Sequence, residues 1–296
     1  MEITHPPVAN ILTRSSGFLR TVCSHSLQPY RGCPLGSSLC GQGCYVRHSP
    51  WVTRGRAWGS FLEVRDQAAE SYLATVARER AWARRARGSF AIFMASATEP
   101  FPAAERRFGV SRRVLEAMLE EPPDLLIVQT HSADVVRQQE LLLRLQARCR
   151  LRVHLSIETD RERLPGLPPP ASPVRARFAA AEELHRRGLH VVITVSPILP
   201  IADPPAFFAL IARCASAVVL DHYIGGDGTP DGRRTLATPL PRAMAALEPE
   251  SVQLAYRDRM AEVAARFLPG KVGINVDGFA GRYLGATGGA RSRDET

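Results

Sequence analysis

Lysine is almost absent from this chain of 296 residues. Lys271 is the single lysine among 38 basic residues, and the rest are arginine. The net charge of +9 is compatible with a polyanionic partner such as nucleic acid. Faces that bind nucleic acid usually mix both basic residues, however, and an excess of arginine is typical of a GC-rich genome. A solvated basic surface is the simpler interpretation, and the arginine-rich run at 77–88 fits the exposed face of a helix.

Long apolar runs are missing as well. No stretch of eighteen apolar residues occurs, so the sequence predicts no membrane span. The first seventeen residues lack the basic-then-apolar pattern of a secretory signal, and we therefore expect a cytoplasmic protein. In that compartment the six cysteines are more often metal ligands, reactive thiols or small buried residues than disulfides.

Internal repeats are also lacking, and what recurs is an alternation of strand-like and helix-like segments. The strand-like runs are rich in Val, Ile or Leu and too short to form the core of a helix. They lie at 89–96, 124–130, 151–157, 190–196, 217–223 and 272–276. A first strand is expected at 18–27, before a loop that contains three cysteines.

Helix-like segments separate these runs, and several begin with a residue that can cap a helix. Ser111 opens one segment, and Ser132 or Asp134 caps the next. Ser172 stands before a proline, which is a helix-start signature, and Gly188 is the matching stop signal. The expected helices cover 60–86, 111–121, 132–149, 172–189, 203–215 and 249–268.

Strands and helices that alternate at this spacing predict β/α units and a parallel sheet buried on both faces. Six units end near residue 224, and this regular part is shorter than a complete eight-unit barrel requires. We therefore expect an α/β fold, a partial (β/α)6 TIM-like barrel, with a doubly wound open sheet as the rival architecture. The expected domains are an N-terminal segment (1–17), the barrel core (18–224) and an irregular C-terminal extension (225–296) with a loop at 225–234 and a frayed tail at 288–296.

Three cysteines share the glycine-rich loop after the first expected strand. Cys33, Cys40 and Cys44 are spaced C-x6-C-x3-C, and no fourth cysteine lies nearby. In a barrel this loop would lie at the carboxyl ends of the strands, where active sites are found. Structural zinc needs four ligands, for which His48 is a candidate, and a chance grouping of thiols is a second alternative. The third is a [4Fe–4S] cluster with one open iron, which leaves a coordination position for a substrate or cofactor.

Several segments between residues 20 and 224 resemble the radical S-adenosylmethionine (radical SAM) superfamily. The resemblance is closest to its spore photoproduct lyase-like branch, also described as DNA repair photolyase-like. The matching segments, in order, are SLQPYRGCP…CYVR, LEVR, FMASATEPFPAAERRF, VHLSIETDRERL and VSPILP. The superfamily's usual spacing is C-x3-C-x2-C, from which this chain departs, and Gly43 replaces the aromatic residue that commonly precedes the third cysteine.

The resemblance implies a [4Fe–4S] cluster held by Cys33, Cys40 and Cys44, with S-adenosylmethionine (SAM) at the open iron. Reductive cleavage of SAM would give a 5′-deoxyadenosyl radical that abstracts hydrogen from a substrate. The residues assigned to SAM are Tyr45, Ser96, Thr98, Glu99, Ser156, Glu158 and Ser196. The alternatives are a helix cap or turn for Ser96 and a surface salt bridge for Glu158. No residue is assigned to the catalytic step itself.

Other polar residues also follow expected strands. Thr130, His131 and Ser132 follow the third strand, and an N-cap is the alternative role for Ser132. His222 and Tyr223 end the sixth strand and are candidates for the substrate side, although a buried tyrosine with one hydrogen bond is the alternative for Tyr223.

The remaining cysteines bear on the choice of reaction. Spore photoproduct lyases use an additional thiol as hydrogen donor, but Cys149 and Cys214 precede strands, and Cys23 lies in or before the first one. Thymine-dimer repair is therefore not carried over. We expect a radical SAM enzyme of lyase or oxidoreductase type with an unidentified substrate, reduced by a donor such as flavodoxin or ferredoxin. The alternatives are a nucleic-acid lesion lyase, a non-catalytic zinc or iron–sulfur protein, and a basic nucleic-acid-binding module.

Overall fold

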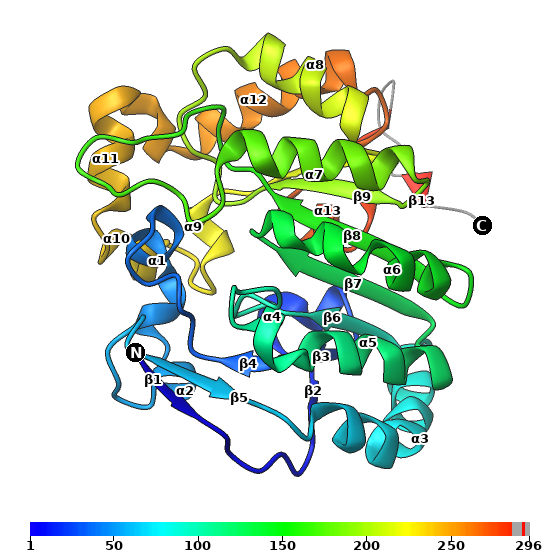
Figure 1. Ribbon diagram of the computed structural model, residues 1–296. Helices are drawn as coiled ribbons and strands as arrows, with labels where there is room; N and C mark the ends of the chain where they lie inside the picture. Colours follow the sequence, from blue (N-terminus) through cyan, green and yellow to red (C-terminus); the bar gives the residue numbers. More distant parts are fainter. Residues whose placement is uncertain (286–291, 294–296) are drawn as a thin grey trace. The chain divides into compact units, whose positions relative to one another are not determined.

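The computed structural model describes residues 1–285 and 292–293. These residues form two compact units (Figure 1). The first comprises residues 1–36 and 46–154, and the second comprises residues 37–45 and the described residues from 155 onward. Residues 286–291 and 294–296, which include most of the tail expected at 288–296, lie outside the described residues. Within the described residues, no helix is long and apolar enough to cross a membrane.

The first unit contains a sheet with the strand order β2–β3–β6–β7. Its strands are β2 (Leu12–Arg14), β3 (His25–Leu27), β6 (Ala91–Met94) and β7 (Leu125–Thr130). β3, β6 and β7 run parallel, and β2 pairs with β3 in the antiparallel direction. Every residue of β6 is buried, as expected for a parallel strand between two layers.

Three longer helices of the first unit pack in series beside this sheet. α3 (Ala68–Arg87) contacts α5 (Val110–Glu120), which contacts α6 (Gln139–Gln146), and Figure 1 shows the three side by side. Shorter elements complete the unit: α2 (Pro50–Thr53), α4 (Glu105–Phe108), and the 3-10 turns η1 (Gly17–Thr21) and η3 (Ala133–Gln138). A further 3-10 turn, η2 (Tyr45–His48), begins at the last residue of the 37–45 segment.

A second small sheet of the first unit corrects the sequence prediction at 60–86. The predicted helix begins instead with a strand, β5 (Phe61–Val64), and α3 starts only at Ala68. β5 lies between β1 (Glu2–Thr4) and β4 (Tyr30–Arg31), and all four of its residues are buried. The pairing of β5 with a strand on each side therefore outweighs the helix-compatible sequence pattern of residues 60–64.

The second unit contains the parallel strands β9 (Val191–Val195), β10 (Ala217–Leu220) and β11 (Val272–Ile274) in that order. β8 (Arg150–Ser156) carries the chain into this unit, and β12 (Arg282–Tyr283) pairs with β13 (Ser292–Arg293). Its helices are α1 (Leu39–Gly43), α7 (Val174–Arg186), α8 (Pro204–Cys214), α9 (Tyr223–Gly226), α10 (Arg233–Leu236), α11 (Leu240–Leu247), α12 (Leu254–Phe267) and α13 (Asn275–Phe279), with the 3-10 turn η4 (Pro249–Val252).

The predicted alternation of parallel strands and helices is confirmed within each unit, whereas closure into a partial barrel and the three expected domains stay predictions. Two local predictions are wrong. Ser111 is not an N-cap: it lies inside α5, which starts after Gly109, and its buried hydroxyl donates to the Pro100 carbonyl at 2.5 Å. The strand expected at 272–276 ends at Ile274, because Asn275 has a positive φ of 49° and begins α13.

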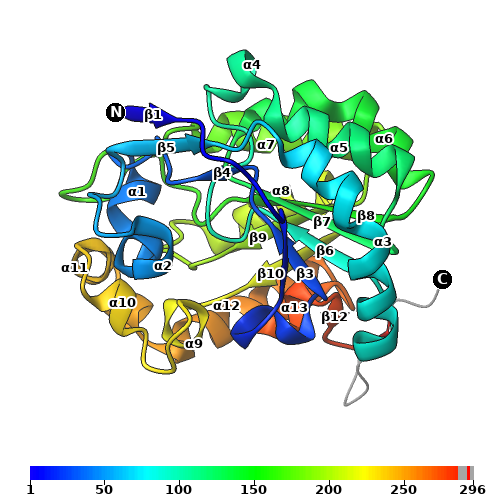
Figure 2. The ribbon, with the colours of Figure 1, turned by 90° about the horizontal axis from the view of Figure 1, so that it is seen from below.

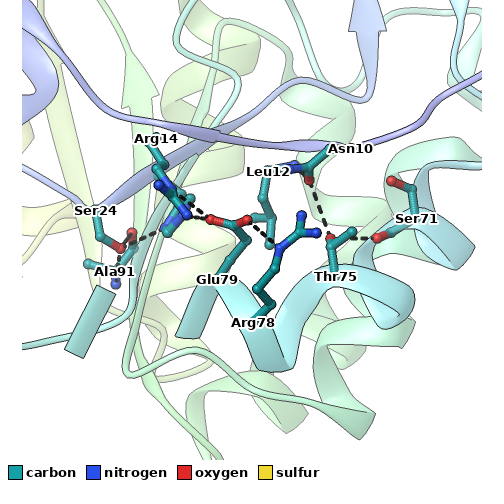
Figure 3. A network of polar contacts seen from close by, with 10 residues as sticks. Asn10, Leu12, Arg14, Ser24, Ser71, Thr75, Arg78, Glu79 and Ala91 are labelled. Carbon is teal, nitrogen blue, oxygen red and sulfur yellow. Dashed lines mark hydrogen bonds and ion pairs between the residues drawn. The ribbon is translucent and has the colours of Figure 1, made fainter. Parts of the chain in front are cut away.

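A buried polar network ties the N-terminal segment to α3 (Figure 3). Glu79 accepts hydrogen bonds from Arg14 Nε at 2.9 Å and Arg78 Nε at 3.0 Å. The same carboxylate lies 3.2 Å from the ring nitrogen Nε2 of the buried His25. Since His25 and Ala91 begin β3 and β6, this network lies at the amino ends of the strands and serves the scaffold.

We predict that Glu79→Gln lowers the free energy of unfolding by about 2–3 kcal/mol, because charge-assisted hydrogen bonds are lost at a buried carboxylate. Burial raises the pKa of Glu79, but the hydrogen bonds from Arg14, His25 and Arg78 outweigh it and hold this pKa below its ordinary value. The contribution of the carboxylate is therefore complete at neutral pH and is lost as the pH falls through its lowered pKa. Urea unfolding at pH 7 and pH 3 should show a difference between variant and parent that shrinks in acid.

The matched control is Glu183→Gln, which removes a carboxylate from arginine pairs on the surface of α7. This variant should unfold at nearly the same urea concentration as the parent. Equal midpoints for Glu79→Gln and the parent would contradict a structural role for the network.

Candidate functional site

Two polar residues follow neighbouring strands at the carboxyl edge of the second unit. Leu220 of β10 is in register with Val195 of β9, so Ser196 and Asp221 come next on the two strands. The Ser196 hydroxyl donates to Asp221 Oδ2 at 3.0 Å. Asp221 is 3% exposed, and burial raises the pKa of this carboxyl to about 7. Ser196 was assigned to SAM from the sequence, and the structure places it as the partner of this aspartate.

The short helix that carries Cys40 and is followed by Cys44 lies at the same edge. Leu39 of α1 packs in one apolar cluster with Leu199 and Tyr223, which come shortly after the ends of β9 and β10. In Figure 2, α1 lies beside α11, and a Cβ placed on Gly43 would come within 2.9 Å of the Leu240 side chain. This part of the loop therefore packs near the carboxyl ends of strands of the second unit, while its role as a cluster site stays a prediction.

The local structure of α1 fixes Cys40 and leads directly into Cys44. Ser38 caps the helix by accepting a hydrogen bond from the Gly41 amide at 3.3 Å. Cys40 is the second residue of this helix, and Cys44 is the C-cap residue, where the backbone becomes extended. Both thiols are half-buried, so they are held in place yet accessible to a ligand.

Tyr45 follows this pair and lies near the carboxyl edge. Burial raises the pKa of its phenol, and the nearby Cys44, Asp221 and Asp227 raise it further. The predicted SAM residue Tyr45 is therefore brought together with Cys44 and Asp221 inside the second unit.

The predicted SAM residues Ser156 and Glu158 are engaged by a buried arginine that the sequence analysis missed. Arg177 of α7 is 2% exposed, and its Nη1 donates to the Ser156 carbonyl at 2.5 Å and to Glu158 Oε2 at 2.8 Å. The Ser156 hydroxyl lies 3.0 Å from that of Thr194. The alternative of a surface salt bridge for Glu158 is wrong, because the ion pair is buried.

In the first unit, the chain turns sharply where β6 ends. Ala95 has a φ of 71°, in the left-handed region that a residue with a side chain enters at a cost of about 1–2 kcal/mol. This turn directs the following segment toward Gln28, whose Nε2 donates to the Ser96 hydroxyl at 2.8 Å. Gln28 Oε1 in turn accepts from the Thr98 hydroxyl at 3.1 Å. Gln28, which the sequence analysis did not single out, thus holds both predicted SAM residues.

Glu99 connects the ends of β6 and β7. Its Oε1 accepts from the Thr130 hydroxyl at 2.5 Å and from the Phe101 amide at 2.9 Å, and its Oε2 accepts from the His131 amide at 2.8 Å. Burial raises the pKa of Glu99, against the effect of these donors. A carboxylate has about four acceptor positions, and these three donors occupy most of them. Ser132 is the N-cap of η3, as its alternative role predicted.

Cys33, the first cysteine of the loop, belongs to the first unit and is buried. It follows β4, where the Tyr30 carbonyl accepts from the Thr98 hydroxyl at 3.1 Å. Its neighbour Gly32 has a φ of 78°, and a Cβ there would lie 2.4 Å from the Phe61 carbonyl oxygen. Only glycine therefore fits before this cysteine.

Several other predicted candidates have structural roles. His222 caps α9, with its Nδ1 accepting from the Ile224 amide at 3.1 Å. The Tyr223 hydroxyl donates to the Val252 carbonyl at 3.1 Å, which is the alternative role given for this tyrosine. Cys149 immediately precedes β8 and Cys214 ends α8 before β10, so both lie toward the amino ends of strands.

The donor set fits an iron–sulfur cluster by its chemistry. All six cysteines are described, and none forms a disulfide. Three thiols on one loop are the ligands that such clusters use. Within residues 1–285 and 292–293, however, no three His, Cys, Asp or Glu side chains are grouped as a metal site. His48, the candidate fourth zinc ligand, is exposed. Ligation by Cys33, Cys40 and Cys44 stays a prediction.

No family model and no curated protein matches the chain, but solved structures do. A cysteine-to-alanine mutant of spore photoproduct lyase, bound to the dinucleoside spore photoproduct, aligns with a TM-score of 0.62 and 13% identity, covering 92% of this chain and 80% of that chain. A cysteine-to-serine mutant gives 0.59 and 14%, covering 92% and 81%. A double mutant with bound AdoMet and the dinucleoside gives 0.59 and 12%, with the same coverage.

This chain shares the fold of spore photoproduct lyase. The structural agreement extends over nine-tenths of the chain. The sequence identity of 13–14% is low, so the agreement shows a shared fold and not a shared reaction. It is in line with the resemblance drawn from the ordered segments at the level of the fold.

Proposed function

We propose that this protein is a radical SAM enzyme. The observation that carries the proposal is the placement of Cys40 in α1 and of Cys44 directly after it, in a segment that packs near the carboxyl ends of β9 and β10. Cys33 in the same loop completes a set of three thiolates for a [4Fe–4S] cluster. When bound and reduced, the cluster would supply the electron that cleaves SAM to a 5′-deoxyadenosyl radical.

The residues of the chain would bind and orient this cofactor. Cys33, Cys40 and Cys44 would hold the cluster as thiolates. Ser96, Thr98 and Glu99 are acceptors at the end of β6 and would bind the ammonium group of SAM, with Gln28 holding the first two in place. Tyr45, Ser156, Glu158 and Ser196 are assigned to the remaining parts of SAM. A flavodoxin or ferredoxin would supply the electron.

The reaction class is that of a lyase or oxidoreductase. The spore photoproduct lyase mutant with this fold holds a dinucleoside spore photoproduct, and that ligand is a property of spore photoproduct lyase alone. Here Cys149 and Cys214 lie toward the amino ends of their strands, and we therefore propose hydrogen abstraction from a substrate that is not a thymine dimer.

The test is SAM cleavage by the anaerobically prepared and reduced protein. We expect a brown protein whose electron paramagnetic resonance signal shifts when SAM is added and which slowly forms 5′-deoxyadenosine without substrate. A fully loaded, reduced cluster that neither binds nor cleaves SAM would leave an electron carrier. A colourless protein with one zinc per chain would establish a structural zinc site instead.

Gln28→Ala should weaken SAM binding by about tenfold, because Ser96 and Thr98 lose the amide that positions them. The cluster should be unaffected, since this glutamine contributes no ligand. Calorimetric titration of SAM into the anaerobic protein measures the change. Gln67→Ala, at an exposed glutamine before α3, is the control and should bind SAM as the parent does. Unchanged affinity in Gln28→Ala would show that the β6 loop is not part of the SAM site.

A further inference from the structure

Asp221 differs from the other buried aspartate of its loop in that one oxygen has no partner. Ser196 donates to Oδ2, and the backbone amide of His222 also lowers the pKa of this carboxyl, whereas Oδ1 is buried and has no well-formed hydrogen bond within the described residues. Asp227, six residues on, has both oxygens occupied: Oδ1 accepts from Thr229, and Oδ2 accepts from the Thr235 amide at 2.8 Å. Asp227 therefore holds the loop together with both of its oxygens. A purely structural role of this kind for Asp221 would not explain why its Oδ1 is buried without a partner.

A glycine segment covers this carboxylate. A Cβ on Gly226 would lie 2.5 Å from Oδ2 and 2.8 Å from Oδ1 of Asp221, so no side chain fits there. The neighbouring Gly225 has a φ of 80°, and Ile224 also departs from helical geometry inside α9. The cover is thus a short backbone segment without bulky side chains, and a ligand that contacts Oδ1 would have to displace it.

The charged groups around Asp221 favour a cationic ligand. The positive charge of Arg257 lowers the pKa of the Asp221 carboxyl, but this arginine is itself paired with Asp258 at 2.6 Å. Asp227 adds negative charge, and Tyr45 and His222 are the other titratable groups that interact with Asp221 or flank it. A desolvated carboxylate gains most from a donor that carries positive charge.

We propose that Asp221 Oδ1 is a substrate-binding group that accepts a hydrogen bond from a cationic nitrogen, such as an amine, amidine or guanidine, while Ser196 fixes the orientation of the carboxylate. This inference rests on the proposed function in one respect: it takes the cationic ligand to be the substrate of the proposed radical SAM enzyme. Binding itself does not require SAM cleavage, so the two proposals fail separately.

The probe is methylguanidinium, and its neutral control of the same shape is methylurea. Calorimetry on the anaerobic holoprotein at pH 7, repeated in buffers of different ionisation enthalpy, measures affinity and proton release together. Because the pKa of Asp221 is about 7, binding of the cation should release about half a proton. We expect methylurea to bind at least tenfold more weakly and to release none.

The variants assign the effect to Asp221. Asp221→Asn should weaken methylguanidinium binding at least tenfold and abolish proton release, and Ser196→Ala should weaken binding while retaining proton release. Asp231→Asn, at an exposed position in the same loop, should behave as the parent. Equal binding of methylguanidinium and methylurea, parental binding by Asp221→Asn, or no binding by the parent would each overturn the proposal. Ser196→Ala keeps the test decisive if Asp221→Asn fails to fold.

Discussion

Replacing Cys40 with alanine should leave the anaerobically prepared protein without an iron–sulfur cluster. Cys40 lies in α1 and Cys44 directly follows this helix, and the two thiolates left after the replacement are too few to hold a four-iron cube. Iron and sulfide content, together with the visible absorption of the purified protein, measures the loss. The same result is expected for Cys33→Ala and Cys44→Ala.

Cys214→Ala is the matched control for these variants. Cys214 is buried at the end of α8, and burial raises the pKa of its thiol to about 11, so it is a poor source of thiolate. Its replacement should leave the iron content unchanged. If Cys40→Ala retained a full cluster, the C-x6-C-x3-C spacing would not describe the ligand set, and the exposed His48 would be the next residue to replace.

Replacing Arg177 with methionine should lower the free energy of unfolding by about 3–5 kcal/mol, the usual consequence of removing one partner of a buried ion pair. Arg177 is 2% exposed and is the cation that pairs with Glu158 at 2.8 Å. Methionine fills much of the same volume, so the effect reports lost charge and hydrogen bonds rather than a cavity. Urea unfolding of the cluster-free protein provides the measurement.

A double-mutant cycle separates this pair from its surroundings. Arg177→Met combined with Glu158→Gln should be less destabilised than the sum of the two single variants, because the second change removes the uncompensated carboxylate. Arg175→Met, on the same helix, is the control for the loss of an arginine. Strict additivity would mean that the Glu158 carboxylate is not stabilised through Arg177.

The strands were predictable from sequence because buried parallel strands are apolar throughout. Runs such as 124–130 and 190–196 coincide closely with β7 and β9. The strand at Phe61–Val64 was missed because it directly precedes a long helix-forming segment, and its two strand partners are distant in sequence. Local patterns carry no information about such pairing, which decides the conformation of this segment.

The cysteines of the candidate site stand out in the sequence by their spacing, whereas the residues that support this site do not. Arg177 falls on the apolar face of α7 with Val174, Ala181 and Leu184, and a charged residue in such a stripe was the available signal. Asp221 directly follows an apolar strand and gave a comparable signal. Gln28 gave no such signal in the sequence. Its role depends on the left-handed turn at Ala95, and an alanine at this position does not predict a positive φ.

The apolar anchoring of α1 has a consequence for how the cluster is acquired. Leu39 lies in a buried core cluster and Ser38 caps the helix, so α1 is held by contacts that contain no metal. In zinc fingers, by contrast, metal binding supplies the free energy of folding. Here Cys40 lies in an already folded helix and Cys44 directly follows it, so the iron and sulfide of the proposed cluster would be inserted late, into a finished scaffold. The cluster-free protein should accordingly be a stable, isolable precursor with the circular dichroism spectrum of the cluster-loaded protein.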